Sequence, residues 1–173
     1  MTDRVALLRG INVGGANNLK MADLRGLAER LGWFDVRTVV ASGNLLFRSE
    51  SSPGFLSNQM AYALERAFGL SLSVIVLTSA SFGEALAACP FEPEDDRQVH
   101  LFFPDGEIRL DQKIIGKFRA QSEELTVIAN IAYFYTPDGF GRSKLAAKMK
   151  RALGSTVTGR NLRKCRKIAD FSG

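Results

Sequence analysis

The residues best suited to chemistry stand in one short string near the N-terminus. Arg9-Gly10-Ile11-Asn12-Val13-Gly14-Gly15 combines a guanidinium, an amide side chain and glycines whose backbone a ligand can approach closely. Such groups bind phosphate or carboxylate. The string lacks the G-x-G-x-x-G spacing of dinucleotide-binding loops and the Gly-Lys-Ser/Thr ending of a P-loop. Taken alone, it is equally typical of a structural turn that needs glycine for positive φ and asparagine for local hydrogen bonds.

A second polar group, Ser42-Gly43-Asn44, separates the apolar segments 36–41 and 45–47 and predicts the turn of a hairpin. The apolar run 5–8, just before the Arg9 string, predicts a buried strand. In a split βαβ sheet the first strand ends at the edge where this hairpin turns. Because neighbouring strands lie about 4.8 Å apart, we expect Asn44 to lie within one phosphate's reach of the backbone of 10–15. Lys20 is expected to extend the cluster.

The C-terminal region is strongly basic. Residues 139–173 hold one acid, Asp170, and ten basic side chains: Arg142, Lys144, Lys148, Lys150, Arg151, Arg160, Arg163, Lys164, Arg166 and Lys167. This local balance of +9, within a chain of formal charge +5, leaves −4 for the other 138 residues. Such a surface attracts polyanions. The alternative, that these charges form the solvated faces of two terminal helices, carries about equal weight.

Two groups of these basic residues coincide with predicted helix starts. Arg142, Ser143 and Lys144 stand at the start of a helix predicted near 143–153. Arg160 and Asn161, after Thr158, stand at the start of one predicted near 160–169. A cation at a helix N-terminus is disfavoured by about 0.3–1 kcal/mol. A bound anion would make the position electrostatically favourable for the cation. If the last helix docks at the Arg9 loop, Thr158, Arg160 and Asn161 would form a second wall of the site.

Other candidates for catalysis are weak. The only histidine, His100, lies inside an apolar strand, where a hydrogen-bonded structural role is expected and a His-dependent triad is not. Cys89 and Cys165 are predicted to be packing residues, although basic neighbours of Cys165 could lower its pKa. The acidic stretch 92–96 lacks the ligand order of a calcium loop and is expected to be solvated. We therefore predict neither a metal nor a cofactor.

The elements that must position these residues follow from periodicity. Through residue 78 the order is strand, helix, strand, strand, helix, strand, with helices predicted over 21–31 and 53–68 and a last strand over 72–77. A helix over 78–88 follows, with Ser81 and Glu84 at capping-box spacing. The second half predicts a strand over 99–103, a helix over 111–118, and a hairpin over 125–135 that turns at Ala129-Asn130, before the two terminal helices.

These elements predict an α+β fold of two packed ferredoxin-like subdomains, residues 1–80 and 81–173. Hydrophobic residues make up 46% of the chain, which argues against disorder. No apolar run approaches the roughly 18 residues of a membrane span, and the N-terminus lacks a signal-peptide pattern. The two cysteines are far apart, so neither a disulfide framework nor a zinc site is indicated. We expect a soluble cytoplasmic protein with no membrane partner.

The chain resembles the domain of unknown function 1697 family. The resemblance rests on Leu7-Leu8-Arg9-Gly10-Ile11-Asn12-Val13-Gly14-Gly15, Met21 with Leu24, Ser42-Gly43-Asn44, Gly141-Arg142-Ser143-Lys144-Leu145 and Arg160-Asn161. It implies two ferredoxin-like subdomains and a bacterial, cytoplasmic origin, but no established activity. Family members commonly carry a Thr-Thr-Arg-Asn-Trp-Asn-Thr-like sequence near the end, of which Arg160 and Asn161 match here, whereas the aromatic residue and the second threonine are absent.

Three hypotheses for function follow. The leading one is binding of a phosphate-bearing anion, a nucleotide or a nucleic-acid backbone, in a cleft between the subdomains. The second is an enzyme that acts on a small phosphorylated or acyl substrate and stabilises negative charge in the transition state, although no proton acceptor is evident. The third is an interaction module that forms a homo-oligomer through an exposed sheet edge, without a small ligand.

Overall fold

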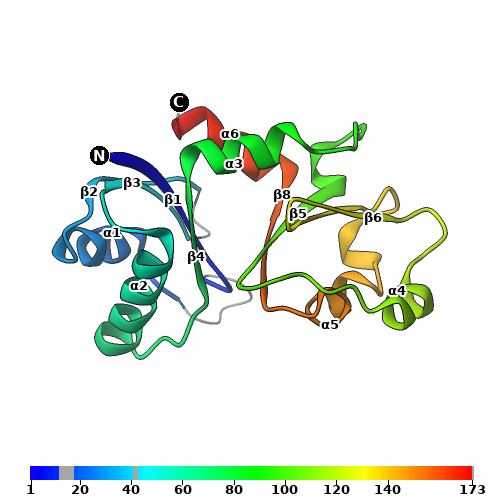
Figure 1. Cartoon of the computed structure of the whole chain (residues 1–173), viewed down its shortest axis with the longest axis horizontal. Helices are drawn as coiled ribbons and strands as arrows, with labels where there is room; N and C mark the ends of the chain where they lie inside the picture. Colours follow the sequence, from blue (N-terminus) through cyan, green and yellow to red (C-terminus); the bar gives the residue numbers. More distant parts are fainter. Residues whose placement is uncertain (12–17, 41–42, 173) are drawn as a thin grey trace. The chain divides into compact units, whose positions relative to one another are not determined.

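The first strand, β1 (Thr2–Leu8), lies inside a four-stranded antiparallel sheet of order β2-β3-β1-β4. The other strands of this sheet are β2 (Phe34–Thr38), β3 (Asn44–Ser49) and β4 (Val74–Thr78), and the helices that alternate with them are α1 (Met21–Arg30) and α2 (Pro53–Phe68) (Figure 1). The computed structural model describes residues 1–11, 18–40 and 43–172. The strand and helix order predicted for the first half is confirmed.

Local sequence signals explain where α2 begins and ends. The Ser52 hydroxyl accepts a hydrogen bond from the backbone N–H of Phe55, and Pro53 occupies the first helical turn. Gly69 ends the helix at φ 67°, a left-handed conformation that glycine adopts without strain. The inner faces of α1 and α2 pack on one side of the sheet, where Leu24, Leu56 and Leu64 join the core.

The second sheet repeats the topology of the first. It has order β6-β7-β5-β8, again antiparallel throughout. Its elements are β5 (Val99–Pro104), α4 (Gln112–Phe118), β6 (Glu124–Ile128), β7 (Ile131–Tyr135), α5 (Met149–Leu153) and β8 (Val157–Asn161). The predicted turn between β6 and β7 is confirmed, because Ala129 and Asn130 have φ of 48° and 62°, as a type I′ turn requires.

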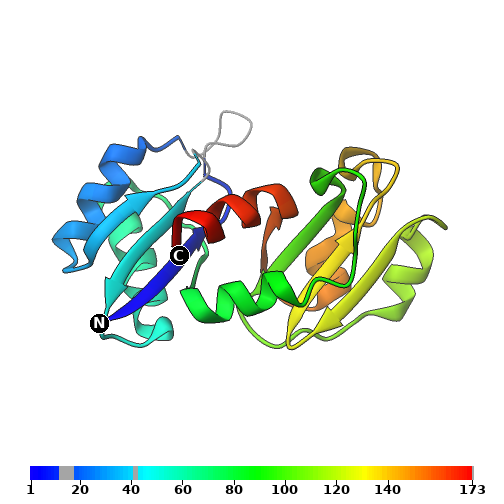
Figure 2. The same ribbon diagram turned by 90° about the horizontal axis from the view of Figure 1, so that it is seen from above.

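The remaining elements are α3 (Ser79–Ala87), α6 (Leu162–Ser172) and the short 3-10 helices η1 (Asp96–Gln98), η2 (Phe140–Arg142) and η3 (Ala146–Lys148). The chain divides into two compact units, Met1–Glu84 with Lys167–Gly173, and Ala85–Arg166. Each unit contains one of the sheets, drawn from a second direction in Figure 2. The structure therefore has the α+β fold of two subdomains that the sequence predicts. Among the described residues, no helix has the length and apolar character to cross a bilayer.

The prediction of a helix over 160–169 was wrong at its start. Residues Val157–Asn161 form β8, and α6 begins only at Leu162. Gly159 explains why this polar, glycine-containing segment is a strand: it pairs with Phe102, whose ring lies where a side chain would stand. A Cβ placed on Gly159 would approach Phe102 Cε1 to 2.7 Å. The segment was difficult to recognise because its glycine serves packing instead of a turn.

Two other local predictions need correction. The helix expected over 143–153 is shorter, consisting of η3 and then α5, which ends at Gly154 with φ 65°. The cap of α3 is not a Ser81–Glu84 box: the Thr78 hydroxyl accepts a hydrogen bond at 3.0 Å from the backbone N–H of Ser81. Threonine immediately before the helix satisfies the same free amide that the expected box would have satisfied.

Candidate functional site

The end of β1 carries an exposed cation beside an open cavity. Arg9 and Gly10 follow directly after β1, and both are exposed. The Arg9 backbone N–H donates to the Ser73 carbonyl at 3.0 Å, and Gly10 has φ 76°. Because β4 pairs with β1 up to Leu8↔Val74, the segment before β4 reaches the same end of the sheet.

The cavity at this end has a volume of about 350 Å³ and is lined by Arg9, Gly10, Ser71, Leu72 and Ser73. Its lining therefore contains a guanidinium, two hydroxyl groups and a glycine, and none of the described residues that line it is a carboxylate. Arginine and hydroxyl donors are the groups that proteins use for phosphate and carboxylate. We call this set of five residues the Arg9 cavity.

The predicted proximity of the first strand and the Gly43–Asn44 turn is confirmed. Leu7 pairs with Asn44, and the Leu8 backbone N–H donates to the Gly43 carbonyl at 2.9 Å. The Asn44 side chain is fully buried, and its Nδ2 donates to the Val39 carbonyl at 3.0 Å. Asn44 thus ties together the two sides of the β2–β3 connection. The predicted site residues Asn12, Gly14, Gly15 and Ser42 lie outside the described residues.

Lys20 does not line the Arg9 cavity. It is exposed at the N-cap position of α1, where its side chain makes no capping bond. A different cavity of about 390 Å³ includes Lys20 together with Asn18, Leu19, Asp23 and Phe68. The two linings have no residue in common, so the expected extension of the cluster through Lys20 finds no support in this geometry.

In the second unit, Arg142, Ser143 and Lys144 surround a short turn instead of the start of a long helix. Arg142 ends η2, and both Arg142 and Lys144 are exposed. The Ser143 hydroxyl accepts a hydrogen bond at 3.1 Å from the backbone N–H of Ala146, the first residue of η3. These residues are therefore held by local turn geometry, and their cations face solvent.

Arg160 and Asn161 belong to β8. The Arg160 side chain is 7% exposed, and its guanidinium donates to the Gly159 carbonyl at 2.9 Å. Burial lowers the pKa of Arg160 to about 10, partly offset by Cys165, so the side chain keeps its positive charge at neutral pH. The Asn161 Oδ1 accepts from the Lys164 backbone N–H at 2.8 Å and so satisfies a free amide at the start of α6.

His100 lies in β5, as predicted, but its expected hydrogen bonding was wrong in one respect. The ring stacks on Phe140 at 3.7 Å between centroids, and Nδ1 is buried with no partner among the described residues. Burial, reinforced by the charge of Lys164, lowers the pKa of His100 to about 4. A neutral, stacked ring of this kind serves packing and carries no charge at pH 7.

Neither cysteine offers a ready nucleophile. Cys89 and Cys165 are both free thiols. Burial raises the pKa of Cys165 to about 12, outweighing the opposite effect of Arg160. The suggestion that basic neighbours could lower the pKa of Cys165 is therefore wrong, because burial has the larger effect on that pKa. Among residues 1–11, 18–40 and 43–172, no group of histidine, cysteine and acidic side chains is arranged to hold a metal ion.

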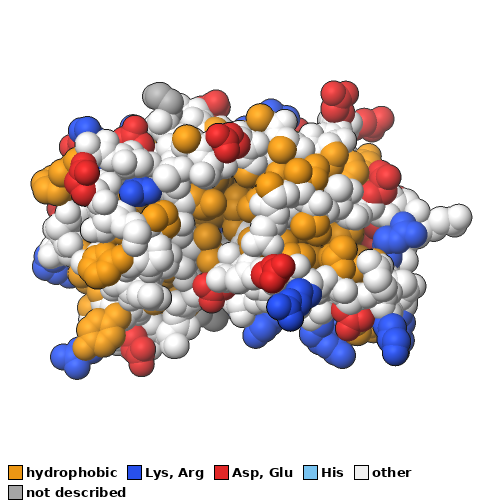
Figure 3. All heavy atoms as spheres, viewed as in Figure 1, with side chains coloured by type: hydrophobic (Ala, Val, Ile, Leu, Met, Phe, Trp, Pro, Cys, Tyr) orange, Lys and Arg blue, Asp and Glu red, His pale blue; other side chains and the backbone are white. Residues whose placement is uncertain are grey.

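Sequence reasoning missed a pair of lysines on the helical face of the second unit. Lys117 Nζ lies 5.3 Å and Lys148 Nζ 5.4 Å from the centroid of the same ring, Phe118. Lys and Arg side chains gather in this region, over α4 and α5 (Figure 3). The only signal in the sequence is the Lys117-Phe118 dipeptide, because Lys148 is distant along the chain.

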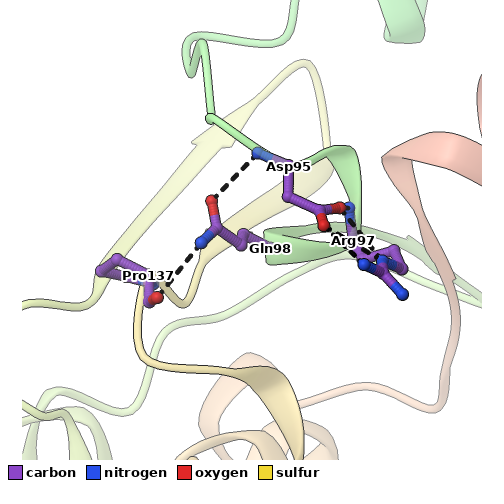
Figure 4. Close-up of polar contacts among 4 residues, drawn as sticks. All are labelled: Asp95, Arg97, Gln98 and Pro137. Atoms are coloured by element: carbon purple, nitrogen blue, oxygen red, sulfur yellow. Dashed lines mark hydrogen bonds and ion pairs between the residues drawn. The ribbon is translucent and has the colours of Figure 1, made fainter.

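The acidic stretch is organised by its own contacts. Asp95 makes a two-pronged ion pair with Arg97, with the shortest N–O distance at 2.7 Å (Figure 4). Hydrogen bonds from Arg97 lower the pKa of Asp95 to about 2. Gln98 accepts from the Asp95 backbone N–H and donates to the Pro137 carbonyl. These bonds form a capping box for η1, and the carboxylate of Asp95 is committed to it.

The fold and the Arg9 cavity define a protein built from two ferredoxin-like units with a small polar hollow at the end of the first strand. The chain belongs to the family described as "Protein of unknown function (DUF1697)", whose model matches residues 1–133. Residues 142–144 and 160–161 lie beyond that match.

A similar solved structure is "The structure of conserved bacterial protein SP0830 from Streptococcus pneumoniae". It is 23% identical, with a TM-score of 0.73 over 99% of each chain, which supports the fold. Among the curated proteins, none matches the chain.

Proposed function

We propose that the protein binds a phosphate-bearing small molecule at the Arg9 cavity. The observation that carries the proposal is the lining of this hollow: its described residues bring one exposed guanidinium and two serine hydroxyls, and none of them is a carboxylate. An anion there would accept hydrogen bonds from Arg9, Ser71 and Ser73. Hydrogen bonds to charged groups contribute about 1.5–3 kcal/mol each, so one arginine has a measurable share of the affinity.

The size of the hollow favours a compact phosphate group over an enclosed ligand. A volume of about 350 Å³ lies at the lower end of small-molecule sites, roughly 300–1,000 Å³. The exposure of Arg9 and Gly10 leaves the remainder of the ligand free to extend into solvent. A nucleotide held by its phosphates fits this description.

Calorimetric titration of a nucleoside triphosphate and of inorganic phosphate into the full chain tests the proposal. Arg9→Gln removes the charge but keeps a polar side chain, and is expected to raise the dissociation constant at least about tenfold. Arg25→Gln is the matched control, since Arg25 is an exposed arginine of α1 whose side chain pairs with Glu29. Absence of binding, or equal loss in both variants, would remove the proposal.

A second candidate function, binding of a nucleic-acid backbone, is favoured by Lys117 and Lys148. Both ammonium groups lie within 5.4 Å of the centroid of one ring, so they add two positive charges to the same small region, which would attract a phosphate backbone. Such binding weakens steeply with salt because counterions are released. Titration of a single-stranded oligonucleotide at two salt concentrations separates this function from the Arg9 cavity. The double variant Lys117→Gln with Lys148→Gln should reduce the dependence of the oligonucleotide affinity on salt concentration, whereas Arg9→Gln should leave that dependence unchanged.

A further inference from the structure

The outer strand of the second sheet, β6, has a backbone edge with which no strand within residues 1–11, 18–40 and 43–172 pairs. Figure 2 shows it beside α4 at the end of its sheet, where β7 is its neighbour. The register runs without a shift from Glu124↔Tyr135 to Ile128↔Ile131. Residues that flank a two-residue hairpin turn form a hydrogen-bonded pair, and such pairs alternate along the strand. Leu125 and Val127 therefore direct their N–H and C=O groups to the open edge.

The equivalent strand of the first sheet is protected against further pairing, whereas β6 is not. β2 and β6 occupy corresponding positions in the two sheet orders. β2 has a register shift between Phe34 and Arg37, and Asp35 within it has φ 51°. Bulges and charged side chains are the devices that keep edge strands from associating. β6 is regular, and after Glu124 it carries only uncharged residues.

Exposed apolar side chains gather at the same edge. Every residue of the unit Ala85–Arg166 is described, and its exposed large hydrophobic side chains are Leu110, at 42%, and Ile128, at 36%. Ile128 ends β6. Leu110 lines a groove of about 340 Å³ between α4 and β6, together with Ile115 and Leu125. Both exposed apolar groups of this unit thus lie where a further strand would add.

We propose that this edge is a homodimer interface, in which β6 pairs antiparallel with β6 of a second copy and the two-fold axis passes at Thr126. In this register Leu125 lies opposite Val127 of the second copy, so the outward N–H and C=O groups of each strand meet their complements. Leu125 and Val127 also face the apolar cluster beneath the helices. Pairing therefore joins two hydrophobic layers as well as two sheets.

The charges around α4 favour a second copy over an unrelated strand. Arg119 follows the C-terminal end of α4 and lines the groove, and Asp111 caps its N-terminal end. The two-fold axis reverses one helix relative to the other, so the end of α4 that carries Arg119 faces the end of the second copy's helix that carries Asp111. Within its own chain the Arg119 guanidinium also donates to the Glu123 carbonyl at 2.6 Å. The edge is thus complementary to itself in backbone, apolar and charged groups, as a two-fold interface requires.

Sedimentation velocity on the full chain over a range of concentrations tests the dimer. Thr126→Lys and Thr126→Glu each place like charges directly opposite at the axis, and each is expected to raise the dimer dissociation constant at least about tenfold. An equimolar mixture of the two variants places opposite charges together and should restore the dimer. A folding defect could not produce this rescue.

Thr38→Lys on β2 is the control, because Thr38 ends the protected edge of the first sheet, and it should dimerise like the wild type. A wild-type chain that remains monomeric at every concentration would overturn the proposal. So would Thr126 variants that dimerise with wild-type affinity, or a mixture that stays monomeric. Arg9→Gln should not affect the dimer, so the outcome is independent of the proposed anion site.

Discussion

The backbone N–H of Arg9 donates to the carbonyl of Ser73 at 3.0 Å, and this bond brings the residue after β1 next to the segment before β4. The arginine belongs to a string that is conspicuous in the sequence, whereas the serines do not stand out. Their meeting follows from the sheet order, in which β4 is the outer neighbour of β1. The Arg9 cavity is therefore a consequence of topology more than of any local motif.

Asn44 should matter for stability more than for binding. Asn44→Ala leaves the buried Val39 carbonyl without its side-chain donor, and an unsatisfied buried group costs about 1–3 kcal/mol. Chemical denaturation should show this loss, whereas Asn58→Ala, at an exposed position of α2, should change the free energy of unfolding by less than about 0.5 kcal/mol. Equal stability of the two variants would contradict the structural role of Asn44.

Gly159 should not tolerate a side chain. Gly159→Ala forces a methyl group against the Phe102 ring, and overpacking of this kind costs about 1–3 kcal/mol. Gly83 in α3 is the matched control, since nothing lies within 4 Å of a Cβ placed there. Gly83→Ala should instead stabilise the protein by about 0.4–1 kcal/mol. Thermal unfolding would distinguish the two variants. A melting temperature of Gly159→Ala equal to that of the wild type would argue against the packing of β8 on Phe102.

His100 should titrate well below an exposed histidine. Its pKa of about 4 in the folded state lies below the ordinary histidine value of 6.5, so the unfolded chain binds more protons between these two pH values. Stability should therefore fall as pH decreases from about 6.5 to 4, by at most about 1.4 kcal/mol per pH unit from this residue. His100→Phe should flatten that part of the curve. NMR titration of the only histidine reads the pKa directly, and a value near 6.5 would contradict its burial.

Cys165 should be chemically inert in the folded protein. Burial and a pKa of about 12 leave almost no thiolate at pH 8. In a Cys89→Ser background, a thiol reagent should label Cys165 only after denaturant is added. Cys165→Ser in the wild-type background isolates Cys89 as the reference for a less buried thiol. Rapid labelling of Cys165 in native buffer would be inconsistent with the structure.

Periodicity and turn chemistry predicted most of the fold because the relevant signals are local. The Ser52-Pro53 start of α2 and the Ala129-Asn130 turn each follow from a few adjacent residues. β8 was missed because its conformation depends on Phe102, which is remote in sequence and occupies the space above Gly159. A strand that is selected by packing leaves little trace in its own residue types.

The candidate site was harder to predict for the same reason. Arg9 and Asn44 were expected to share a ligand, and the predicted pairing of their strands brings them near each other. The sequence could not reveal that the Asn44 amide turns inward to Val39, nor that Ser71 and Ser73 line the cavity with Arg9. Side-chain direction and long-range pairing decide these roles.

The most direct test of the anion-binding account is a phosphate titration followed by amide chemical shifts. Added inorganic phosphate should shift the backbone N–H signals of Gly10, Ser71 and Ser73 in a saturable manner at constant ionic strength. The same signals should remain still in Arg9→Gln. Saturable shifts confined to other parts of the chain, or no shifts at all, would contradict the assignment of the Arg9 cavity as the binding site.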